Sequence, residues 1–494
     1  MRIVSTLRRM LSKIRIAPSL PRAAVSQPTS RPPRRRHSPK PPRGQAAPPP
    51  PSRPALALQA PPLVQLEQDV LERFRPQMQQ ALQDEIDALA TAQEHGSRPT
   101  CCCRAMSNHG TRSVPSLAWM GRVRIRARRF RCKRCRRERR PLLEQLEVEP
   151  GRPSGLLARL LGLLGCVASY SLAAEMAAQI LGVKVNAMTV WRAVQRLGEA
   201  AASHTEAMST YHADSHSEAP PNSHSPDAVV VAVDGCSLGM QVRSKRRRRK
   251  TADEVLPALP RVEEGHFREV KTGVLLLPAE RVSLSPDRRA LVRRVLVTCL
   301  GDADALFDRL WAQLRERGWL GANTVVVVVG DGSEWIWNRA SMFTKRCEIL
   351  DFWHAIEYAW DYARPQFGEG SRNAERWVHR LAQDLKAGKV QQIIARLKTL
   401  HPISDDSRNA LGALIKYYTD NASRMHYDEY LRLGYGIGSG SVESAHKQVV
   451  HARLRQAGMR WSELGARRLL ALRLLLLNRD WATVNRLRMV RIAA

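Results

Sequence analysis

The sequence lacks two features that would place a protein in a membrane or outside the cell. It has no run of about 18 uninterrupted apolar residues, the length that a membrane-spanning helix needs. The longest apolar region, residues 156–181, is interrupted by Arg159 and Glu175. Cysteine is also scarce, with nine in 494 residues, which argues against a disulfide-rich secreted scaffold. These absences predict a cytoplasmic protein without a membrane span.

Acidic residues are scarce relative to basic ones. The chain has 46 Asp and Glu against 79 Lys and Arg, a formal net charge of +33 and a pI near 10.8. Residues 1–66 hold 13 Lys and Arg and no acid, but the rest of the chain still carries a net charge of +20. Self-repulsion of this size destabilises a fold unless a polyanion binds. Nucleic acid is the obvious candidate, because each neutralised phosphate releases counterions.

The first two hundred residues differ in composition from segment to segment. Proline and arginine dominate residues 1–62, which predicts a disordered basic arm. Residues 63–99 have helical periodicity, and Pro76 should kink or divide that helix. A basic segment with several cysteines follows at residues 100–145, and helical periodicity returns at residues 150–203.

The second half of the chain alternates predicted strands and helices. Buried strands are predicted at AVVVAVDGC and TVVVVVGDGSEW, because β-branched residues run through them without alternation, and FREVKTGVLLLP is predicted to be a further strand. A helix is expected at about residues 286–318, and residues 352–433 have helical periodicity throughout. After the glycine-rich GYGIGSGS, a long helical region should end near Asn478. This order argues for an α/β fold.

Two acids stand at the ends of predicted strands. Asp234 closes VVVAVD and Asp331 closes VVVVVGD, and each is followed by a glycine. In α/β sheets, catalytic groups gather beyond the carboxyl ends of the strands. Either aspartate alone is commonly just a turn residue. Together, in a basic protein, they indicate carboxylate ligands for magnesium.

The third acid of such a site is less obvious. Glu443 lies in the first turn of a predicted helix, where a glutamate also simply favours the helix dipole. It ranks first because flexible glycines precede it, and Glu334 and Asp351 are the rivals. The same helix carries a face suited to phosphates, made of His446, Lys447, His451, Arg453 and Arg455.

Three blocks of the sequence resemble the ISKra-type insertion-sequence transposases, which are similar to the Mutator-like DDE group. They are GDGSEWIWN, ILDFWHAIEYAW and IGSGSVESAHKQVVHARLRQAGMRWSELGARRLLALR, and the resemblance covers roughly residues 100–485. It implies a ribonuclease-H-like core at residues 226–351 and 434–485, interrupted by an all-helical insertion at residues 352–433. The catalytic triad then falls on Asp234, Asp331 and Glu443, which would hold two Mg²⁺ ions for strand transfer. The group's C/D-x-x-H motif becomes Asp351 and His354. His354 would contact a phosphate or orient a ligand, or else serve as an ordinary histidine at a helix start.

Residues 170–200 have the pattern of a helix-turn-helix DNA-binding module. A turn is predicted at Gly182-Val183, followed by a second helix that Asn186 caps. An ordinary helical hairpin would have the same pattern. If the second helix enters a major groove, its base- and backbone-contacting residues are Thr189, Arg192, Gln195 and Arg196.

The clustered cysteines indicate a degenerate zinc-ribbon-like module. Cys132 and Cys135 form one regular C-x-x-C pair. The resemblance implies a second pair upstream, but the sequence there has three adjacent cysteines, Cys101-Cys102-Cys103. Cys101 with Cys103, or one cysteine with His109, would complete a Zn²⁺ site. A metal-free remnant is the alternative.

These features leave three hypotheses. The first is a bacterial DDE transposase, associated with the nucleoid, that acts as a homo-oligomer on terminal inverted repeats and target double-stranded DNA. The second is a DNA-binding regulator with an inactive catalytic fold, against which the intact Asp234, Asp331 and Glu443 argue. The third is a ribonuclease-H-like nuclease that does not join strands.

Overall fold

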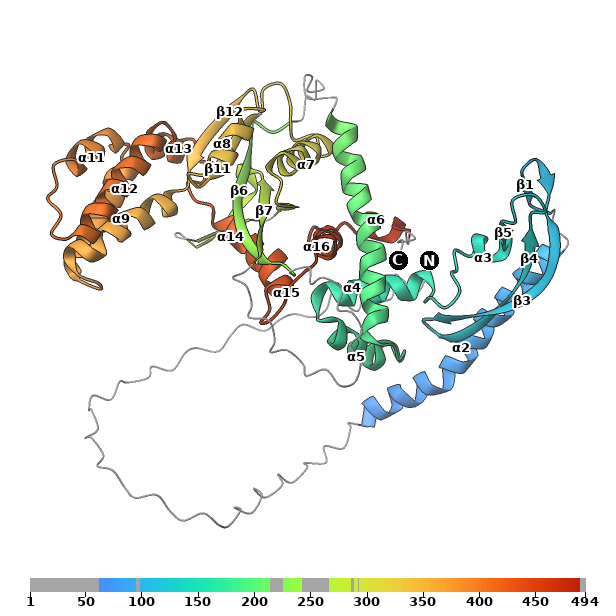
Figure 1. The fold of residues 1–494 in the computed structure, drawn as a ribbon. Helices are drawn as coiled ribbons and strands as arrows, with labels where there is room; N and C mark the ends of the chain where they lie inside the picture. Colours follow the sequence, from blue (N-terminus) through green and yellow to red (C-terminus); the bar gives the residue numbers. More distant parts are fainter. Residues whose placement is uncertain are drawn as a thin grey trace, which may run out of the picture. The chain divides into compact units, whose positions relative to one another are not determined.

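The computed structural model of the chain describes residues 62–94, 98–213, 225–241, 266–285, 288–291 and 293–488. The chain divides into two units, Met1–Val64 and Gln65–Ala494. Nearly all of the first unit lies outside the described residues, and with it the expected basic arm. The second unit is a mixed α/β structure in which helices outnumber strands around a five-stranded sheet (Figure 1).

A long β-ribbon follows the first described helix, α2 (Pro62–Glu94). Its strands, β3 (Ser107–Ala118) and β4 (Gly121–Arg131), pair antiparallel. Apolar residues alternate with arginines in β4, so one face of the ribbon is apolar. This face forms a small core in which Ile125 is packed with Ile86 of α2.

Helix α2 runs through Pro76 without the expected division. A proline removes the hydrogen bond to the carbonyl four residues earlier, which is that of Glu72. Glu72 lies in an exposed stretch of the helix, where water can satisfy the freed carbonyl. The helix therefore tolerates the proline.

Three helices follow the ribbon: α4 (Gly155–Val167), α5 (Tyr170–Leu181) and α6 (Ala187–Ala213). Helix α6 extends well beyond the recognition helix predicted from the sequence and packs along the later helix α16 (Glu463–Leu477). A Cβ atom on Gly198 would lie 2.4 Å from the carbonyl oxygen of Arg468, so only glycine allows this approach of the two backbones. Helix α6 is thus built into the core.

The central sheet has the strand order β10-β7-β6-β11-β12. Strands β6 (Ala228–Gly239), β7 (Phe267–Leu276) and β10 (Val295–Leu300) pair antiparallel. Strand β11 (Val325–Gly330) lies parallel to β6, and β12 (Arg346–Leu350) lies parallel to β11. Nearly all of the apolar side chains in these strands are buried, as expected for strands covered on both faces.

Helices pack on opposite faces of this sheet. Gly273 of β7 faces Leu310 of α7 (Ala303–Glu316), since a Cβ atom there would lie 2.7 Å from the leucine side chain. Successive side chains of a strand point to opposite faces of the sheet. Asp234 points to the face opposite the one that α7 covers, toward α14 (Gly440–His446). The site described below therefore lies on the α14 side.

The helix expected at residues 286–318 is wrong in its first half. Residues 295–300, VLVTCL, form the edge strand β10, and α7 begins only at Ala303. A run of β-branched and apolar residues buried along its whole length favours a strand. At the free edge of β10, the side-chain amide of Asn478 exchanges two hydrogen bonds of 2.8 Å with the backbone of Leu296.

The chain between Phe352 and Arg432 is helical (Figure 1). Helix α9 packs against α10 and α12, and α11 packs against both α10 and α12. The bounds are α9 (Phe352–Phe367), α10 (Arg372–Lys386), α11 (Val390–Leu397), α12 (Asp405–Asn421) and α13 (Tyr427–Arg432).

The long helical region expected after the glycine-rich segment is broken into pieces. Helix α14 continues through a π-helical turn, Lys447–His451, into α15 (Ala452–Leu454), and then the helix stops. Gly458 adopts a φ of 74° in the turn between α15 and α16. The remaining elements are β1 (Thr100–Cys101), β2 (Arg104–Ala105), β5 (Glu138–Arg139), α3 (Pro141–Gln145), the 3₁₀ turn Pro278–Glu280, β8 (Arg281–Ser285), β9 (Arg288–Leu291), α8 (Glu334–Ala340), the 3₁₀ turn Ala422–Arg424 and α17 (Trp481–Arg486).

Candidate active site

Three aspartates lie level with one another on three adjacent parallel strands of the sheet. Asp331 and Asp351 directly follow β11 and β12, whereas Asp234 lies within β6, so the prediction that Asp234 closes its strand is wrong. Val329 of β11 pairs with Ala232 of β6, so Asp331 and Asp234 each lie two residues beyond a matched pair. Gly330 of β11 pairs with Leu350 of β12, so Asp331 and Asp351 are also level. The strand register thus brings all three carboxylates to the same edge.

Asp234 is half-buried, and the pKa of its carboxyl group is raised. Its Oδ1 accepts a hydrogen bond of 2.7 Å from the backbone N–H of Gly235. Burial, together with the charges of Asp331 and Asp351, raises its pKa to about 6 against the opposing effects of the Gly235 hydrogen bond and of His354. A cation held between these acids would stabilise the charged form of Asp234.

Asp331 keeps one carboxylate oxygen open. Its Oδ1 accepts a hydrogen bond of 2.9 Å from the backbone N–H of Ser333, and within the described residues its Oδ2 has no protein partner. The adjacent Gly332 is needed for packing, because a Cβ atom there would lie 2.5 Å from the ring of Tyr417. Tyr417 stacks on Tyr358 with ring centroids 4.0 Å apart, so an aromatic pair borders this side of the acids.

Asp351 is fully buried, and protein donors occupy both of its oxygens. Oδ1 accepts a hydrogen bond of 2.7 Å from the backbone N–H of Trp353, which caps α9. Oδ2 accepts the backbone N–H of Ser439 at 2.9 Å and also the Ser439 hydroxyl. Burial alone would raise the pKa of Asp351, but the partners His354 and Ser439 outweigh it and the pKa is lowered. Asp351 therefore anchors the start of α14 and is a poor candidate for a metal ligand.

His354 forms an ion pair with Asp351, with Nδ1 3.1 Å from Oδ2. This partner, helped by the charges of Glu357 and Asp234, raises the pKa of His354 to about 9 against the effect of burial. The imidazole is therefore protonated at neutral pH. It places a positive charge beside the aspartates.

Glu443 is exposed in the first turn of α14, and its carboxylate has no hydrogen bond or ion pair within the described residues. His446 lies one turn later on the same face of the helix. The buried His446 places Nδ1 3.5 Å from Oδ2 of Asp234. Helix α14 thus faces the aspartates on the side that carries Glu443. The rival Glu334 is exposed at the start of α8, where its charge acts on Lys416 of α12.

Ser439 was not assigned to the site from the sequence, and His446 was predicted to face phosphates, not to lie beside Asp234. Burial lowers the pKa of His446 to about 4, with contributions from the charges of His451 and Arg455, so the ring is neutral. The Glu-x-x-His spacing from Glu443 to His446 is the signal that could have found it. Within the described residues, Nε2 of His446 is buried without a hydrogen-bond partner.

The structure changes the assignment of the predicted groove-facing residues. Gln195 and Arg196 are buried, with 3% and 7% of their surfaces exposed, so neither can reach a base from this position. Arg196 pairs with Glu149 at 2.5 Å, and Gln195 Oε1 accepts a hydrogen bond of 3.4 Å from Arg468. Of the four residues, only Arg192 is fully exposed.

Thr189 and Asn186 cap helix α6. The Oδ1 atom of Asn186 accepts hydrogen bonds from the backbone N–H of Thr189 at 2.8 Å and from its hydroxyl at 2.9 Å. The N-cap predicted for Asn186 is confirmed. The hydroxyl of Thr189 donates its hydrogen bond to this cap and does not point freely toward a groove.

The residues of the C-terminal helices that were predicted to face phosphates are partly exposed and partly buried. Lys447 and Arg455 are exposed, and Arg455 lies 3.0 Å from His451. Arg453 is 1% exposed and donates a hydrogen bond of 3.0 Å to the carbonyl of Gly165. Its guanidinium also stacks over the ring of Tyr170, so it joins α15 to α4 and cannot contact DNA in this arrangement.

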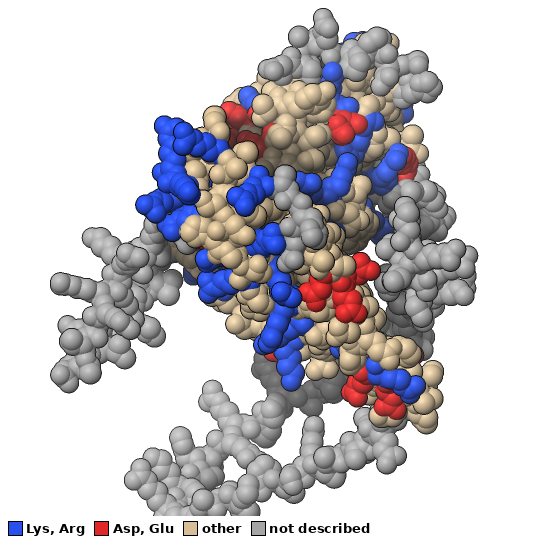
Figure 2. All heavy atoms as spheres, turned by 90° about the vertical axis from the view of Figure 1, so that its right-hand side faces the viewer, with Lys and Arg blue, Asp and Glu red and all other residues tan. Residues whose placement is uncertain are grey.

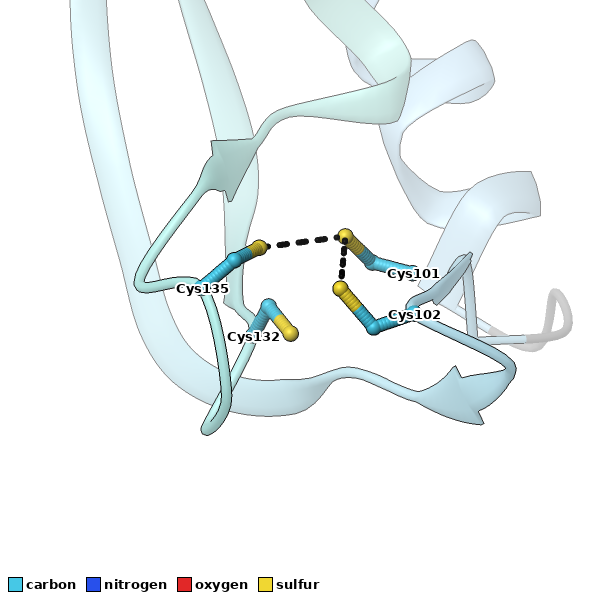
Figure 3. A group of neighbouring side chains, drawn as sticks. All are labelled: Cys101, Cys102, Cys132 and Cys135. Atoms are coloured by element: carbon cyan, nitrogen blue, oxygen red, sulfur yellow. Dashed lines mark hydrogen bonds between the residues drawn. The ribbon is translucent and has the colours of Figure 1, made fainter.

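Four thiols converge beside the β-ribbon (Figure 3). They belong to Cys101, Cys102, Cys132 and Cys135, and their sulfur atoms lie within 4.8 Å of one another. The Sγ of Cys101 is 3.4 Å from that of Cys135 and 3.9 Å from that of Cys102. Tetrahedral zinc with bonds of about 2.3 Å requires sulfur atoms about 3.8 Å apart, so this donor set fits Zn²⁺.

The fourth thiol comes from Cys102, whereas the sequence favoured Cys103. Cys102 and Cys103 have φ angles of 50° and 60° and form the two-residue turn between β1 and β2. Two left-handed residues are typical of such a turn, and they direct successive side chains apart. A hydrogen bond from the backbone of Arg137 and contacts with Cys101 and Cys132 lower the pKa of Cys135 to about 6, so one thiolate is present at neutral pH.

Comparisons with known proteins add little to this geometry. No protein-family model matches the chain, and no curated protein matches it. Among solved structures, the chain is similar to the Drosophila P element transposase strand transfer complex at 11% identity, over 69% of this chain and 96% of that chain. The TM-score is 0.28, too low for the similarity to carry an argument about fold or activity. None of the described helices is long and apolar enough to cross a membrane.

Proposed function

We propose that the protein is a DDE-type transposase with a ribonuclease-H-like core, which cleaves and joins DNA with divalent metal ions. One observation carries the proposal: Asp234 within β6 and Asp331 just after β11 lie level with each other on adjacent parallel strands, and the charge of Asp331 helps to raise the pKa of Asp234. A sheet of three antiparallel strands extended by two parallel ones is the arrangement expected of such a core. The blocks that resemble ISKra-type transposases contain Asp331 and Glu443.

The residues of the site fit a pair of Mg²⁺ ions. Asp234, Asp331 and Glu443 would hold the ions, because each offers carboxylate oxygens that the described residues do not fully use. Bound there, the ions supply Lewis-acid activation of a water or a 3′-hydroxyl and neutralise charge on the leaving oxygen. Asp351 lacks such open oxygens and is assigned to positioning.

The protein's own groups orient this site. Ser439 and Asp351 hold the start of α14 against the end of β12, which sets the position of Glu443. The neutral His446 places Nδ1 3.5 Å from Oδ2 of Asp234 and borders this carboxylate on the α14 side. The protonated His354 adds a positive charge that favours a phosphate in the site.

The wider biological assignment follows from the proposed reaction. The chain would act as a homo-oligomer on the terminal inverted repeats of a bacterial insertion sequence and on target DNA. The four cysteines would hold a structural Zn²⁺ ion in the DNA-binding part of the chain, and the protein would work in the bacterial cytoplasm at the nucleoid.

Purified full-length chain tests the proposal with a duplex that carries the ends flanking its reading frame. With Mg²⁺ we expect cleavage at the element ends and joined products with a second duplex. EDTA should abolish both. Cleavage without joined products would instead support a nuclease, and binding without cleavage would support a DNA-binding regulator.

A further inference from the structure

Strand β4 carries a row of arginines on one face. Its sequence, GRVRIRARRFR, alternates exposed arginines with the buried residues Val123, Ile125 and Ala127. The exposed face holds Arg122, Arg124 and Arg126. Because side chains alternate along a strand, the three arginines project on the side opposite the apolar core.

The rest of the module fixes this strand in place. The apolar face is packed in a small core with α2 and α3. Along the outer edge of β4, the side-chain amide of Gln83 exchanges two hydrogen bonds of 2.8 Å with the backbone of Arg124. Gln79 donates a further bond of 2.7 Å to the carbonyl of Arg122. Hydrogen bonds from α2 thus occupy backbone groups at the outer edge of β4, and they hold in place the strand that carries the arginines.

The arginine face borders a shallow hollow of about 610 Å³. Strand β3 contributes the hydroxyls of Thr111 and Ser113, and Ser113 lies directly opposite Arg126 in the ribbon. One acid, Asp87 of α2, lines the hollow, and Gln83 donates a hydrogen bond of 3.1 Å to its carboxylate. Within the described residues, no hydrogen bond or ion pair neutralises the guanidinium groups of Arg122, Arg124 and Arg126.

Positive charge continues beyond this row. Residues 98–149 hold 15 Lys and Arg against four acids. At the cysteine end of the ribbon, Lys133, Arg134, Arg136 and Arg137 are all exposed. Figure 2 faces the side of the molecule on which β3, β4 and α2 lie in Figure 1, and basic side chains gather across it while acidic ones form smaller separate groups.

We propose that the outer face of the β3–β4 ribbon, with Arg122, Arg124 and Arg126 at its centre, is a binding surface for the phosphate backbone of duplex DNA. Alternate residues of a strand are about 6.8 Å apart. Phosphates of one DNA strand rise ~3.4 Å each along the axis and also turn about it, so the three arginines can contact neighbouring phosphates where β4 follows the backbone. A two-stranded ribbon of this kind also fits the major groove.

This surface takes the place of the helix predicted from the sequence to face the groove. Two of the four predicted residues of α6 are buried in ion-pair and hydrogen-bond contacts. The ribbon proposal rests on the proposed function, because it assigns the DNA that the catalytic core would act on. It makes no use of the catalytic acids.

The experiment compares two triple variants of the full-length chain. R122Q/R124Q/R126Q removes three charges from the ribbon, and R372Q/R380Q/K398Q removes three exposed charges from the helical insertion. Both are measured on a D234N background, so that no cleavage interferes, with a labelled duplex at several salt concentrations. Thermal unfolding checks that each variant is folded.

We expect the slope of log affinity against log salt to fall in magnitude by about 2.7 for the ribbon variant, since each lost phosphate contact removes about 0.9. The insertion variant should keep the parental slope. An unchanged slope in the folded ribbon variant, or an equal decrease in both variants, would overturn the proposal. If the ribbon variant itself does not fold, the single substitution R124Q replaces it, with an expected decrease of about 0.9.

The result is independent of catalysis. If the wild-type chain cleaves no DNA but the ribbon variant shows the expected decrease, the ribbon assignment stands and the transposase proposal fails. If the wild-type chain cleaves and joins DNA while the ribbon variant binds like its parent, the transposase proposal stands and the ribbon assignment fails.

Discussion

The carboxylate of Asp351 accepts the backbone N–H of Ser439 at 2.9 Å and also its hydroxyl, although 88 positions separate the two residues. Both residues are buried, with 0% and 1% of their surfaces exposed. The contact joins the end of strand β12 to the residue that precedes helix α14. It spans the whole helical segment between them, and it thereby fixes where α14 begins relative to the aspartates.

Removing the Ser439 hydroxyl should weaken this joint. We expect Ser439→Ala to lower the free energy of unfolding by about 1.5–3 kcal/mol, because a buried hydrogen bond to a charged group is lost. DNA cleavage should slow as well, since Glu443 loses its fixed position. Denaturant unfolding measures the first effect, with the half-buried neighbour Ser441→Ala as the matched control. Equal stability of the two variants would contradict the role of Ser439.

The raised pKa of Asp234 predicts a specific pH dependence of stability. Its pKa is about 6 in the folded protein and 3.8 as the reference value, so the folded state binds the extra proton between these values. The charged carboxylate therefore destabilises the fold above pH 6 and has no such effect below about pH 4. Without divalent ions, Asp234→Asn should raise the free energy of unfolding at pH 8 by about 1–3 kcal/mol.

This gain from Asp234→Asn should disappear near pH 4. Added Mg²⁺ should stabilise the wild-type chain and not the variant, because only the carboxylate binds the ion. Unfolding curves at pH 4 and pH 8, with and without Mg²⁺, make the comparison. The exposed Asp361→Asn, in a surface ion pair with Arg364, serves as the control. A stability difference independent of pH would be inconsistent with the assigned pKa.

His354 should show the opposite dependence. Its pKa is raised from 6.5 to about 9 chiefly by Asp351, so the ion pair contributes fully below pH 6.5 and is lost as pH rises through 9. We expect His354→Asn to lower the free energy of unfolding by about 1–3 kcal/mol at pH 6 and to have little effect near pH 10. NMR titration of the His354 ring measures the pKa directly, and a value near 6.5 would refute the assignment.

The cysteine cluster predicts one zinc ion per chain. Cys102→Ser should release the metal or weaken its binding strongly, because one of four thiolates is replaced. Cys103→Ser is the matched control on the adjacent residue, which lies outside the cluster, and it should retain the metal. Metal analysis of the purified variants separates them. Loss of zinc in Cys103→Ser and retention in Cys102→Ser would reverse the assignment.

Asp234 and Asp331 were predictable because each follows a run of buried residues in its strand. The valine runs before Asp234 and Asp331 have no polar face, so they indicate central strands of an α/β sheet. Their parallel pairing then brings the two acids together. The register that places Asp351 at the same edge depends on β12, whose sequence, RCEIL, gives only a weak strand signal.

The contacts that the sequence could not reveal join residues far apart in the chain. Arg196 and Arg453 have the exposed, basic character that suggests DNA contact, but their partners are Glu149 and Gly165. A helical periodicity shows which face of a helix is apolar and not which polar residue another helix will cover. The alternation of arginine in β4, by contrast, is a local signal of a strand that the sequence does contain.

Strand cleavage and joining by single variants of the acids test the central claim most directly. We predict that Asp234→Asn, Asp331→Asn and Glu443→Gln each abolish cleavage of a duplex carrying the element ends while binding that duplex almost like the wild type. Glu334→Gln, at the rival exposed glutamate, should cleave and join normally. Full cleavage by any of the three variants would remove that residue from the metal site, and full cleavage by Asp234→Asn or Asp331→Asn would contradict the assignment of the site itself.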